Sequence, residues 1–225
     1  MKFIITGPSS GLGYCLTERL ISRGQVIGVS RSIGRSVIFC KSGLFSHIEY
    51  DFSKECSIEQ FNCLIEKLKL FRGSDPFALI LNAASFYSGK DRLSDPSLTA
   101  LFKVNVYSII NLVKALEDSN LKRIFIVNSI SGLIGQINQH EYTASKHAVM
   151  GFARSLAKAA KNASYDVMCI NPGGMQTELW NNHKEIDTSD FLKPEMVADL
   201  CISLISIPQR TFIEYMSILP PSDVH

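Results

Sequence analysis

Short apolar runs rich in β-branched residues alternate with helical patterns along nearly the whole sequence. Runs such as Ala78–Leu81 and Ile124–Val127 are apolar on both faces, which is typical of parallel strands that helices cover on either side. This alternation predicts an α/β fold of the Rossmann type: a doubly wound, mostly parallel, seven-stranded sheet with helices on both faces. The expected strands are Lys2–Thr6, Gln25–Ser30, His47–Asp51, Phe77–Asn82, Arg123–Asn128, Tyr165–Asn171 and Phe212–Leu219.

Composition limits the partners of the chain. No linker interrupts the 225 residues, so we expect one domain over 1–225 with a small substrate loop around 177–195. The formal charge is only +2 and basic residues are spread along the chain, so no nucleic acid is expected. No apolar segment of about 18 residues stands out, so we expect no membrane partner and a cytoplasmic location. The six cysteines lack zinc-site spacing, which favours free thiols and no metal.

The stretch T-G-P-S-S-G-L-G follows the first expected strand and precedes a helical pattern that we expect to end at a C′ glycine, Gly24. A plain turn needs one glycine, and this stretch has three. Glycine accepts a positive φ, and its missing Cβ lets a phosphate reach the N–H groups at a helix N-terminus. We therefore predict a dinucleotide site here, with a purely structural turn as the alternative. Its residues are Gly7, Ser9, Ser10, Gly11, Leu12 and Gly13.

The end of the second expected strand indicates which dinucleotide binds. An acid at this place commonly binds the ribose of NAD, whereas an arginine suits a 2′-phosphate. The sequence has Ser30 and Arg31 there and no carboxylate. Because arginine pairs with a phosphate dianion and serine can hydrogen-bond it, we predict that NADP(H) is preferred over NAD(H). The alternative is that Arg31 is a solvated surface residue.

A tyrosine and a lysine stand four residues apart in Y-T-A-S-K, so Tyr142 and Lys146 share one face of a helix. A nearby ammonium stabilises a phenolate, and a shift of three pKa units requires about 4 kcal/mol. Ser129, at the end of an expected strand, is placed to hydrogen-bond a substrate oxygen. Ser131 is a competing candidate, and either serine alternatively ends the strand through a bond to the backbone.

Two further patterns concern packing. One helix carries a stripe of small and apolar residues that fits close packing against the core or against another helix. The stripe consists of Ala144, Ala148, Phe152 and Leu156. Apolar residues that follow strand ends are candidates for a substrate pocket, and Trp180 is the best candidate for a lid contact. These are Phe86, Tyr87, Leu133, Ile134, Met175, Leu179 and Trp180.

The motifs T-G-P-S-S-G-L-G, L-N-A-A, K-V-N-V, S-I-S-G, Y-T-A-S-K and N-P-G-G-M-Q-T, in this order, resemble those of the classical short-chain dehydrogenase/reductase family. The resemblance covers essentially the entire chain. It implies a Rossmann-type domain that binds NAD(H) or NADP(H) and interconverts carbonyls and alcohols through an Asn-Ser-Tyr-Lys tetrad. The matching residues are Asn105, Ser129, Tyr142 and Lys146.

The resemblance also implies roles for these residues. Asn105 would hold a helix bend and a water in a proton relay, and Ser129 would polarise the substrate carbonyl. Tyr142 would act as general acid or base, while Lys146 would lower the tyrosine pKa and bind the nicotinamide ribose. Beside Tyr142 and Lys146, the residues expected at the cofactor are Asp51, Phe52, Asn82, Ala83, Ala84, Pro172, Gly173, Met175 and Thr177.

Ala84 departs from the family pattern, because it adds a methyl group where glycine is usual. The family pairs subunits through the helices that correspond to Leu98–Leu116 and Tyr142–Ala160, which implies a homodimer or homotetramer. The leading hypothesis is an NADP(H)-dependent carbonyl reductase or alcohol dehydrogenase acting on a small molecule. The alternative is a catalytically idle dinucleotide-binding sensor or interaction protein, against which the intact tetrad argues.

Overall fold

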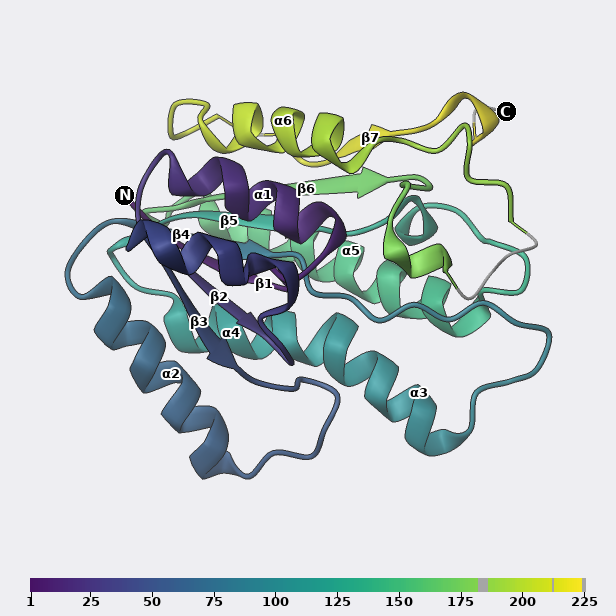
Figure 1. The fold of residues 1–225 in the computed structure, drawn as a ribbon, viewed down its shortest axis with the longest axis horizontal. Coiled ribbons are helices and arrows are strands. Elements are labelled where there is room, and N and C mark those ends of the chain that lie inside the picture. The colour runs from purple at the N-terminus through teal and green to yellow at the C-terminus, as the bar shows by residue number, and fades with distance from the viewer. Residues whose placement is uncertain (182–185, 212, 224–225) are drawn as a thin grey trace.

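A seven-stranded sheet forms the centre of the molecule (Figure 1), and every neighbouring pair of its strands is parallel. The computed structural model describes residues 1–181, 186–211 and 213–223. The strand order β3-β2-β1-β4-β5-β6-β7 confirms the predicted doubly wound Rossmann-type fold. The strands are β1 (Lys2–Thr6), β2 (Val26–Ser30), β3 (Phe45–Glu49), β4 (Phe77–Leu81), β5 (Leu121–Val127), β6 (Asp166–Pro172) and β7 (Met216–Ile218).

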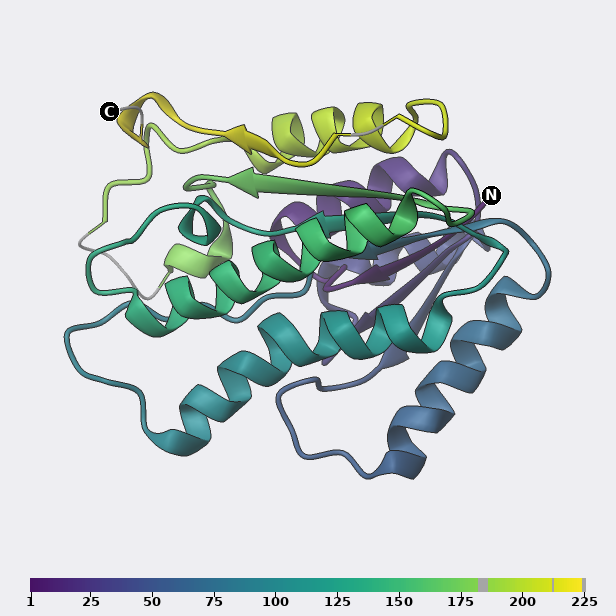
Figure 2. The same ribbon diagram turned by 180° about the vertical axis from the view of Figure 1, so that it is seen from behind.

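Helices cover both faces of the sheet (Figures 1 and 2). They are α1 (Gly11–Ile21), α2 (Ile58–Arg72), α3 (Asp95–Phe102), α4 (Ser108–Leu116), α5 (His140–Ala160) and α6 (Pro194–Ile205). Side chains of α1 and α6 pack on one face, and side chains of α2, α4 and α5 pack on the other. Alternate residues of a strand therefore enter different cores: Ile4 lies among α2, α4 and α5, whereas Phe3 and Ile5 lie against α1 and α6.

β7 begins four residues after its predicted start, and the other strand boundaries differ from the prediction by at most two residues, as in β3. This strand begins at Phe45, which is buried and pairs with Val26, instead of at His47. It ends before Asp51, whose carboxylate accepts hydrogen bonds from the backbone N–H and hydroxyl of Ser53 and so forms a turn. Phe212, the first residue of the last predicted strand, lies outside the described residues, as do residues 182–185 of the predicted substrate loop.

The end of α1 differs from the expectation of a C′ glycine. The helix ends at Ile21 with Ser22 as its C-cap, so Gly24 lies beyond the capping position. A Cβ on Gly24 would overlap the carbonyl oxygen of Met1. Close approach of the start of the chain, and not the helix end, therefore explains this glycine.

The buried face of α5 is not the predicted stripe. Ala144 and Ala148 are exposed, and Phe152 is half-buried. The buried side chains of this helix include Ser145, Lys146, Val149, Met150, Ala153 and Ala157. The core reading of the stripe therefore holds for Phe152 and Leu156, which pack against the core, and fails for Ala144 and Ala148. Its other reading, contact with a further helix, stays a prediction.

Residues Asp95–Leu116 form one long helix made of α3, the π-helical turn Lys103–Tyr107 and α4. Contrary to expectation, this helix is long and apolar enough to meet the criteria for a membrane span. Its buried side chains, such as Ile109, Leu112 and Leu116, belong to the core on one face of the sheet. The helix therefore has the packing of a core helix in an α/β fold. The six cysteines are free thiols, as predicted.

Arg123 ties α6 to the sheet. Its side chain starts on β5, is 3% exposed, and donates hydrogen bonds to the carbonyl oxygens of Leu204 and Ile205 near the end of α6. It also donates to the carbonyl oxygen of Ile207 at 2.9 Å and to Asp166 at 3.1 Å. One guanidinium thus satisfies several carbonyl groups that the end of a helix leaves without partners.

We expect Arg123→Met to lower the free energy of unfolding by about 3 kcal/mol, because the carbonyl oxygens of Leu204 and Ile205 would be left without their buried donor. Urea denaturation measures this change. Arg154→Met is the matched control, since Arg154 pairs with Glu214 at 3.2 Å with both side chains 45% exposed. Such a surface pair contributes about 1 kcal/mol or less. Similar losses in the two variants would contradict the role given to Arg123.

Candidate active site

The glycine-rich turn is held between β1, α1 and β4. Gly7 and Gly11 have φ angles of 69° and 49°, a region that side-chain-bearing residues rarely adopt. A Cβ on Gly13 would overlap the carbonyl oxygen of Gly7, so α1 can lie this close to the turn only with glycine there. Asn82 donates from Nδ2 to the carbonyl oxygens of Thr6 and Gly7, at 3.1 Å each. The three glycines thus serve both backbone conformation and close packing.

The first turn of α1 fits a phosphate group. Within the described part of the chain, the N-cap residue Ser10 makes no side-chain capping bond, and this turn contains no acidic residue. Its N–H groups and the helix dipole are therefore available to an anion. The side chain of Leu12 is buried in the core, so this residue can face a ligand only through its backbone. The carbonyl oxygen of Ser9 accepts a bond from the backbone N–H of Arg35 at 3.2 Å.

At the end of β2, Ser30 and Arg31 differ in their surroundings. Ser30 is buried, and its hydroxyl donates to the carbonyl oxygen of Ser32 at 2.7 Å and lies 2.9 Å from His47 Nε2. Its proton is thus used within the protein, which differs from the expectation that Ser30 hydrogen-bonds a phosphate. Arg31 is exposed. Burial tends to raise the pKa of the neighbouring Asp51, but hydrogen bonds from Ser53 and the charge of Arg31 hold that pKa below its usual value.

Two expected cofactor segments are held by protein contacts. The backbone N–H groups of Asn82 and Ala83 donate to Thr6 Oγ1 at 3.0 Å, which fixes the end of β4 against β1. Ala84 is exposed and has a negative φ, so its methyl group is accommodated without strain. Phe52 packs its ring 5.0 Å from that of Tyr50.

Tyr142, Lys146 and Ser129 lie together at the carboxyl ends of β5 and β6. Tyr142 is 8% exposed and Lys146 only 2%. The Lys146 ammonium lies 5.6 Å from the centre of the Tyr142 ring and donates to the carbonyl oxygen of Asn128 at 3.4 Å. The Ser129 side chain accepts from the backbone N–H of Ser131 at 3.1 Å. Ser129 is half-buried and lines the cavity with Tyr142, whereas Ser131 is 3% exposed, which favours Ser129 as the group that meets a substrate.

Asn105 lies in the π-helical turn, where the helix bends. Its Oδ1 accepts from the backbone N–H of Ser85 at 2.7 Å, and its Nδ2 donates to the Ser85 carbonyl oxygen and to Ser145 Oγ, both at 2.9 Å. Ser145 in turn donates to the carbonyl oxygen of Tyr142 at 2.7 Å. Asn105 therefore joins the bent helix, the segment after β4 and the helix that carries Tyr142.

Burial disfavours the charge of both central groups. It raises the pKa of Tyr142 to about 12, although the hydrogen bond with Ser129 lowers it. Burial also lowers the pKa of Lys146 to about 8. The expectation that Lys146 lowers the tyrosine pKa is thus not met by the protein alone. Desolvation of the phenolate is the largest cause of the raised pKa of Tyr142.

A cavity of about 160 Å³ opens beside Tyr142 and Ser129. Four predicted pocket residues line it: Phe86, Met175, Leu179 and Trp180. The other three lie elsewhere, since the Tyr87 hydroxyl donates to the Asp91 carbonyl oxygen, Leu133 packs on the core and Ile134 is exposed. Gln136, Gln139 and Phe191 line the cavity and were missed. The two glutamines stand between Ser129 and Tyr142 in the sequence, which was the available signal.

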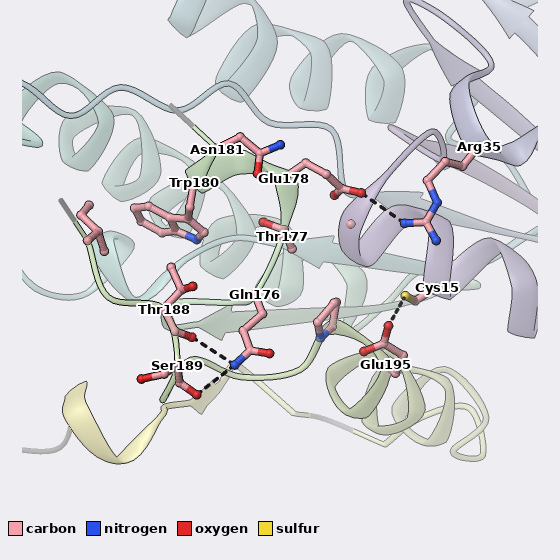
Figure 3. A pocket seen from close by; sticks show the side chains of 13 residues that line it. Cys15, Arg35, Gln176, Thr177, Glu178, Trp180, Asn181, Thr188, Ser189 and Glu195 are labelled. Carbon is pink, nitrogen blue, oxygen red and sulfur yellow. Dashed lines mark hydrogen bonds and ion pairs between the residues drawn. The ribbon is translucent and has the colours of Figure 1, made fainter. Parts of the chain in front are cut away.

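A second cavity of about 610 Å³ lies on the side of the glycine-rich turn (Figure 3). Arg35 pairs there with Glu178 at 3.1 Å and lies 4.4 Å from the centre of the Tyr14 ring. Thr177 lies against Gly11, where a Cβ would be 3.2 Å from the threonine methyl group. Arg35 was missed, although it is a second arginine four residues after Arg31.

The segment after β6 folds back across these cavities. The N–H of Gly173 donates to the Ile218 carbonyl oxygen at 2.8 Å, so the turn after Pro172 is held by β7. Met175 forms a parallel bridge with Leu192. Gln176 donates from Nε2 to the carbonyl oxygens of Thr188 and Ser189, at 3.0 Å each (Figure 3). These contacts hold the segment at the open edge of the sheet.

A parallel sheet with a glycine-rich turn at its switch point and a Ser-Tyr-Lys group at the same edge defines an α/β enzyme of the dinucleotide-binding type. The sequence matches the short chain dehydrogenase family over residues 2–187, and the chain belongs to this family. The protein is accordingly an oxidoreductase.

Curated relatives and solved structures agree with this membership. The 3-oxoacyl-(acyl-carrier-protein) reductase of Buchnera aphidicola is 24% identical over 222 residues, 90% of this chain and 88% of that protein. A 4-hydroxyisoleucine dehydrogenase mutant solved with NADH and succinate has a TM-score of 0.85 at 22% identity, covering 98% of this chain and 97% of that one. L-Sorbose reductase from Gluconobacter frateurii, solved with NADPH and L-sorbose, has a TM-score of 0.83 at 20% identity, covering 97% and 95%.

Titration of the tyrosines tests the electrostatics of the site. Because burial penalises the phenolate, Tyr142 in the free protein should keep its proton until the pH approaches about 12. The measurement is the phenolate absorbance of the wild type minus that of Tyr142→Phe as the pH rises. We expect no difference below pH about 10, the usual tyrosine pKa. A phenolate signal that forms below pH about 10 in the wild type and is absent from Tyr142→Phe would contradict the raised pKa of Tyr142. Circular dichroism has to show that both proteins are folded.

Proposed function

We propose that the chain is an NADP(H)-dependent carbonyl reductase or alcohol dehydrogenase with Tyr142 as its general acid and base. The observation that carries this proposal is that Ser129 and Tyr142 line the same cavity, with the Lys146 ammonium 5.6 Å from the centre of the tyrosine ring. In reduction, the nicotinamide supplies a hydride to the carbonyl carbon, and Tyr142 supplies the proton that completes the alcohol.

The protein's own groups would position and activate the substrate. Ser129 would hold the carbonyl oxygen next to the Tyr142 hydroxyl, since both residues line the same cavity. Lys146 would support a phenolate as the proton leaves and would bond the nicotinamide ribose. Asn105 would act as a positioning residue, because it holds the start of α5 through Ser145.

The dinucleotide would extend along the carboxyl edge of the sheet. Its diphosphate would lie on the glycine-rich turn, where free N–H groups of α1 favour an anion. The adenosine end would approach Arg31, Asp51 and the end of β4, while the nicotinamide end would approach Pro172, Gly173, Met175 and Thr177. Solved structures with NADH and with NADPH among the structural neighbours support a nicotinamide dinucleotide.

We also propose that the chain forms a homodimer or homotetramer through the helices Leu98–Leu116 and Tyr142–Ala160, as the family resemblance implies. The exposed Ala144 and Ala148 on the second helix support this, because small residues permit close contact between helices.

Tyr142→Phe tests the catalytic assignment. The variant keeps the ring and loses the proton donor, so turnover should fall about a hundredfold or more. Binding of NADPH, followed by nicotinamide fluorescence, should persist. Full activity of the variant with any carbonyl substrate would refute the role of Tyr142. A wild type that binds NADPH and turns over no carbonyl in a broad panel would favour the idle sensor.

Arg31→Ala tests the cofactor preference. Loss of a charge-assisted bond to the 2′-phosphate should lower the NADPH-to-NADH ratio of kcat/KM about tenfold or more. Arg23→Ala is the control, because Arg23 stands before the other end of β2 and bonds Ser206 at 2.8 Å. An unchanged ratio in Arg31→Ala, or an equal fall in Arg23→Ala, would show that Arg31 does not select the cofactor.

A further inference from the structure

The cavity beside Tyr142 has an uncharged lining. Among the described residues that line it there is no Asp, Glu, Lys, Arg or His, and Tyr142 is the single residue with a titratable side chain. Lys146 is not part of this lining, since its buried ammonium donates to the carbonyl oxygen of Asn128. The polar groups that do reach the cavity, apart from Tyr142 and Ser129, are neutral, such as the amides of Gln136 and Gln139.

One wall of the cavity is a set of aromatic rings in edge-to-face contact. Phe86 lies 4.9 Å from the ring of Tyr142 and 5.1 Å from that of Trp180. Trp180 lies 5.3 Å from Phe191, whose ring sits where a Cβ on Gly174 would come within 2.8 Å. The indole N–H of Trp180 donates to the Met175 carbonyl oxygen at 2.8 Å, so it presents an apolar surface to the cavity. These contacts fix an apolar wall opposite the reacting hydroxyl.

The size of the cavity limits the substrate. A volume of about 160 Å³ is close to the roughly 150 Å³ of an apolar cavity that binds benzene. Pro172, Gly173 and Thr177 line part of it, on the side expected to meet the nicotinamide carboxamide. This volume fits an apolar group of about the size of one aromatic ring.

The same lining disfavours an anionic substrate. A carboxylate or phosphate carried into this cavity would lose its water and meet no cation among the described lining residues. A neutral carbonyl compound loses far less hydration, and its carbonyl oxygen can accept bonds from Tyr142 and Ser129.

We propose that the substrate is a small, uncharged aldehyde or ketone whose apolar body is about the size of one benzene ring. The aromatic wall selects its size, and the uncharged lining excludes acidic compounds. This inference rests on the proposed function, because it assumes that Tyr142 reduces a carbonyl group in this cavity.

The test compares three aromatic aldehydes with NADPH as the reductant. Benzaldehyde fits the cavity, naphthaldehyde is larger, and para-carboxybenzaldehyde carries a negative charge. We expect kcat/KM for benzaldehyde to exceed that for each of the other two about tenfold or more. A wild type that reduces either of the other compounds as well as benzaldehyde would overturn the inference.

Two variants separate size from charge. Trp180→Ala should raise the ratio of naphthaldehyde to benzaldehyde kcat/KM about tenfold and leave para-carboxybenzaldehyde poor. Gln139→Arg should raise activity on para-carboxybenzaldehyde about tenfold relative to benzaldehyde, whereas the uncharged Gln139→Met should not. Leu70→Ala, at a side chain of α2 that is 84% exposed, is the control and should change neither ratio. Ratios that stay at wild-type values in Trp180→Ala and Gln139→Arg would overturn the inference.

A fluorescence titration with NADPH distinguishes this failure from failure of the proposed function. Turnover with the wrong preference would overturn the substrate class alone. NADPH binding with turnover of other carbonyl compounds but of none of the three aldehydes would overturn the substrate class alone. NADPH binding with no turnover across a broad carbonyl panel, or no NADPH binding at all, would remove the proposed function together with the inference.

Discussion

The carboxyl end of β1, the start of α1 and the end of β4 meet closely. The positions of the other elements depend on how closely these three stretches of backbone approach one another. Gly13 of α1 packs on the carbonyl oxygen of Gly7, and Asn82 bonds the carbonyl oxygens of Thr6 and Gly7 from the end of β4. β1 and β4 are neighbours in the sheet, and from them the chain winds toward opposite edges. A crevice at the carboxyl ends of the strands follows from this topology. The contact that places α1 against the sheet also leaves its N-terminus facing the crevice.

A second buried network positions the reacting groups. Asn105, Ser145 and Tyr142 are joined by hydrogen bonds of 2.9 and 2.7 Å, so the π-helical turn and the start of α5 are held as one unit. Polar side chains such as Asn105 and Lys146, at 1% and 2% exposure, are expensive to bury. Buried polar contacts of this kind hold a proton donor in one orientation, which is a physical reason to bury these side chains despite the cost.

Local patterns along the chain were sufficient to predict the sheet and the glycine-rich turn, whereas the grouping of Ser129, Tyr142 and Lys146 was implied by the resemblance to the family. The spacing of apolar residues did not predict the whole buried face of α5, because the polar Ser145 and Lys146 are buried there beside apolar residues. The prediction that Gly24 is a C′ glycine also failed, because this glycine is required by the close approach of Met1. Spacing along the sequence does not reveal such a contact. Arg35 and Phe191 reach their cavities through loops, and loop geometry depends on tertiary contacts such as the ion pair with Glu178 and the packing on Gly174.

Charge is distributed unevenly between the two sides of the crevice. Arg31, Arg35 and Glu178 are exposed on the side of the glycine-rich turn, where a dinucleotide with its phosphates would lie. On the other side, the cavity beside Tyr142 has a neutral lining among its described residues, and burial raises the pKa of that tyrosine to about 12. Electrostatic attraction therefore acts on the cofactor, whereas shape and desolvation act on the substrate. Because screening by salt weakens interactions of exposed charges more than those inside a cavity, the two kinds of recognition respond to different conditions. On the proposed function, the fold would separate binding of a charged cofactor from selection of a neutral substrate within a single crevice.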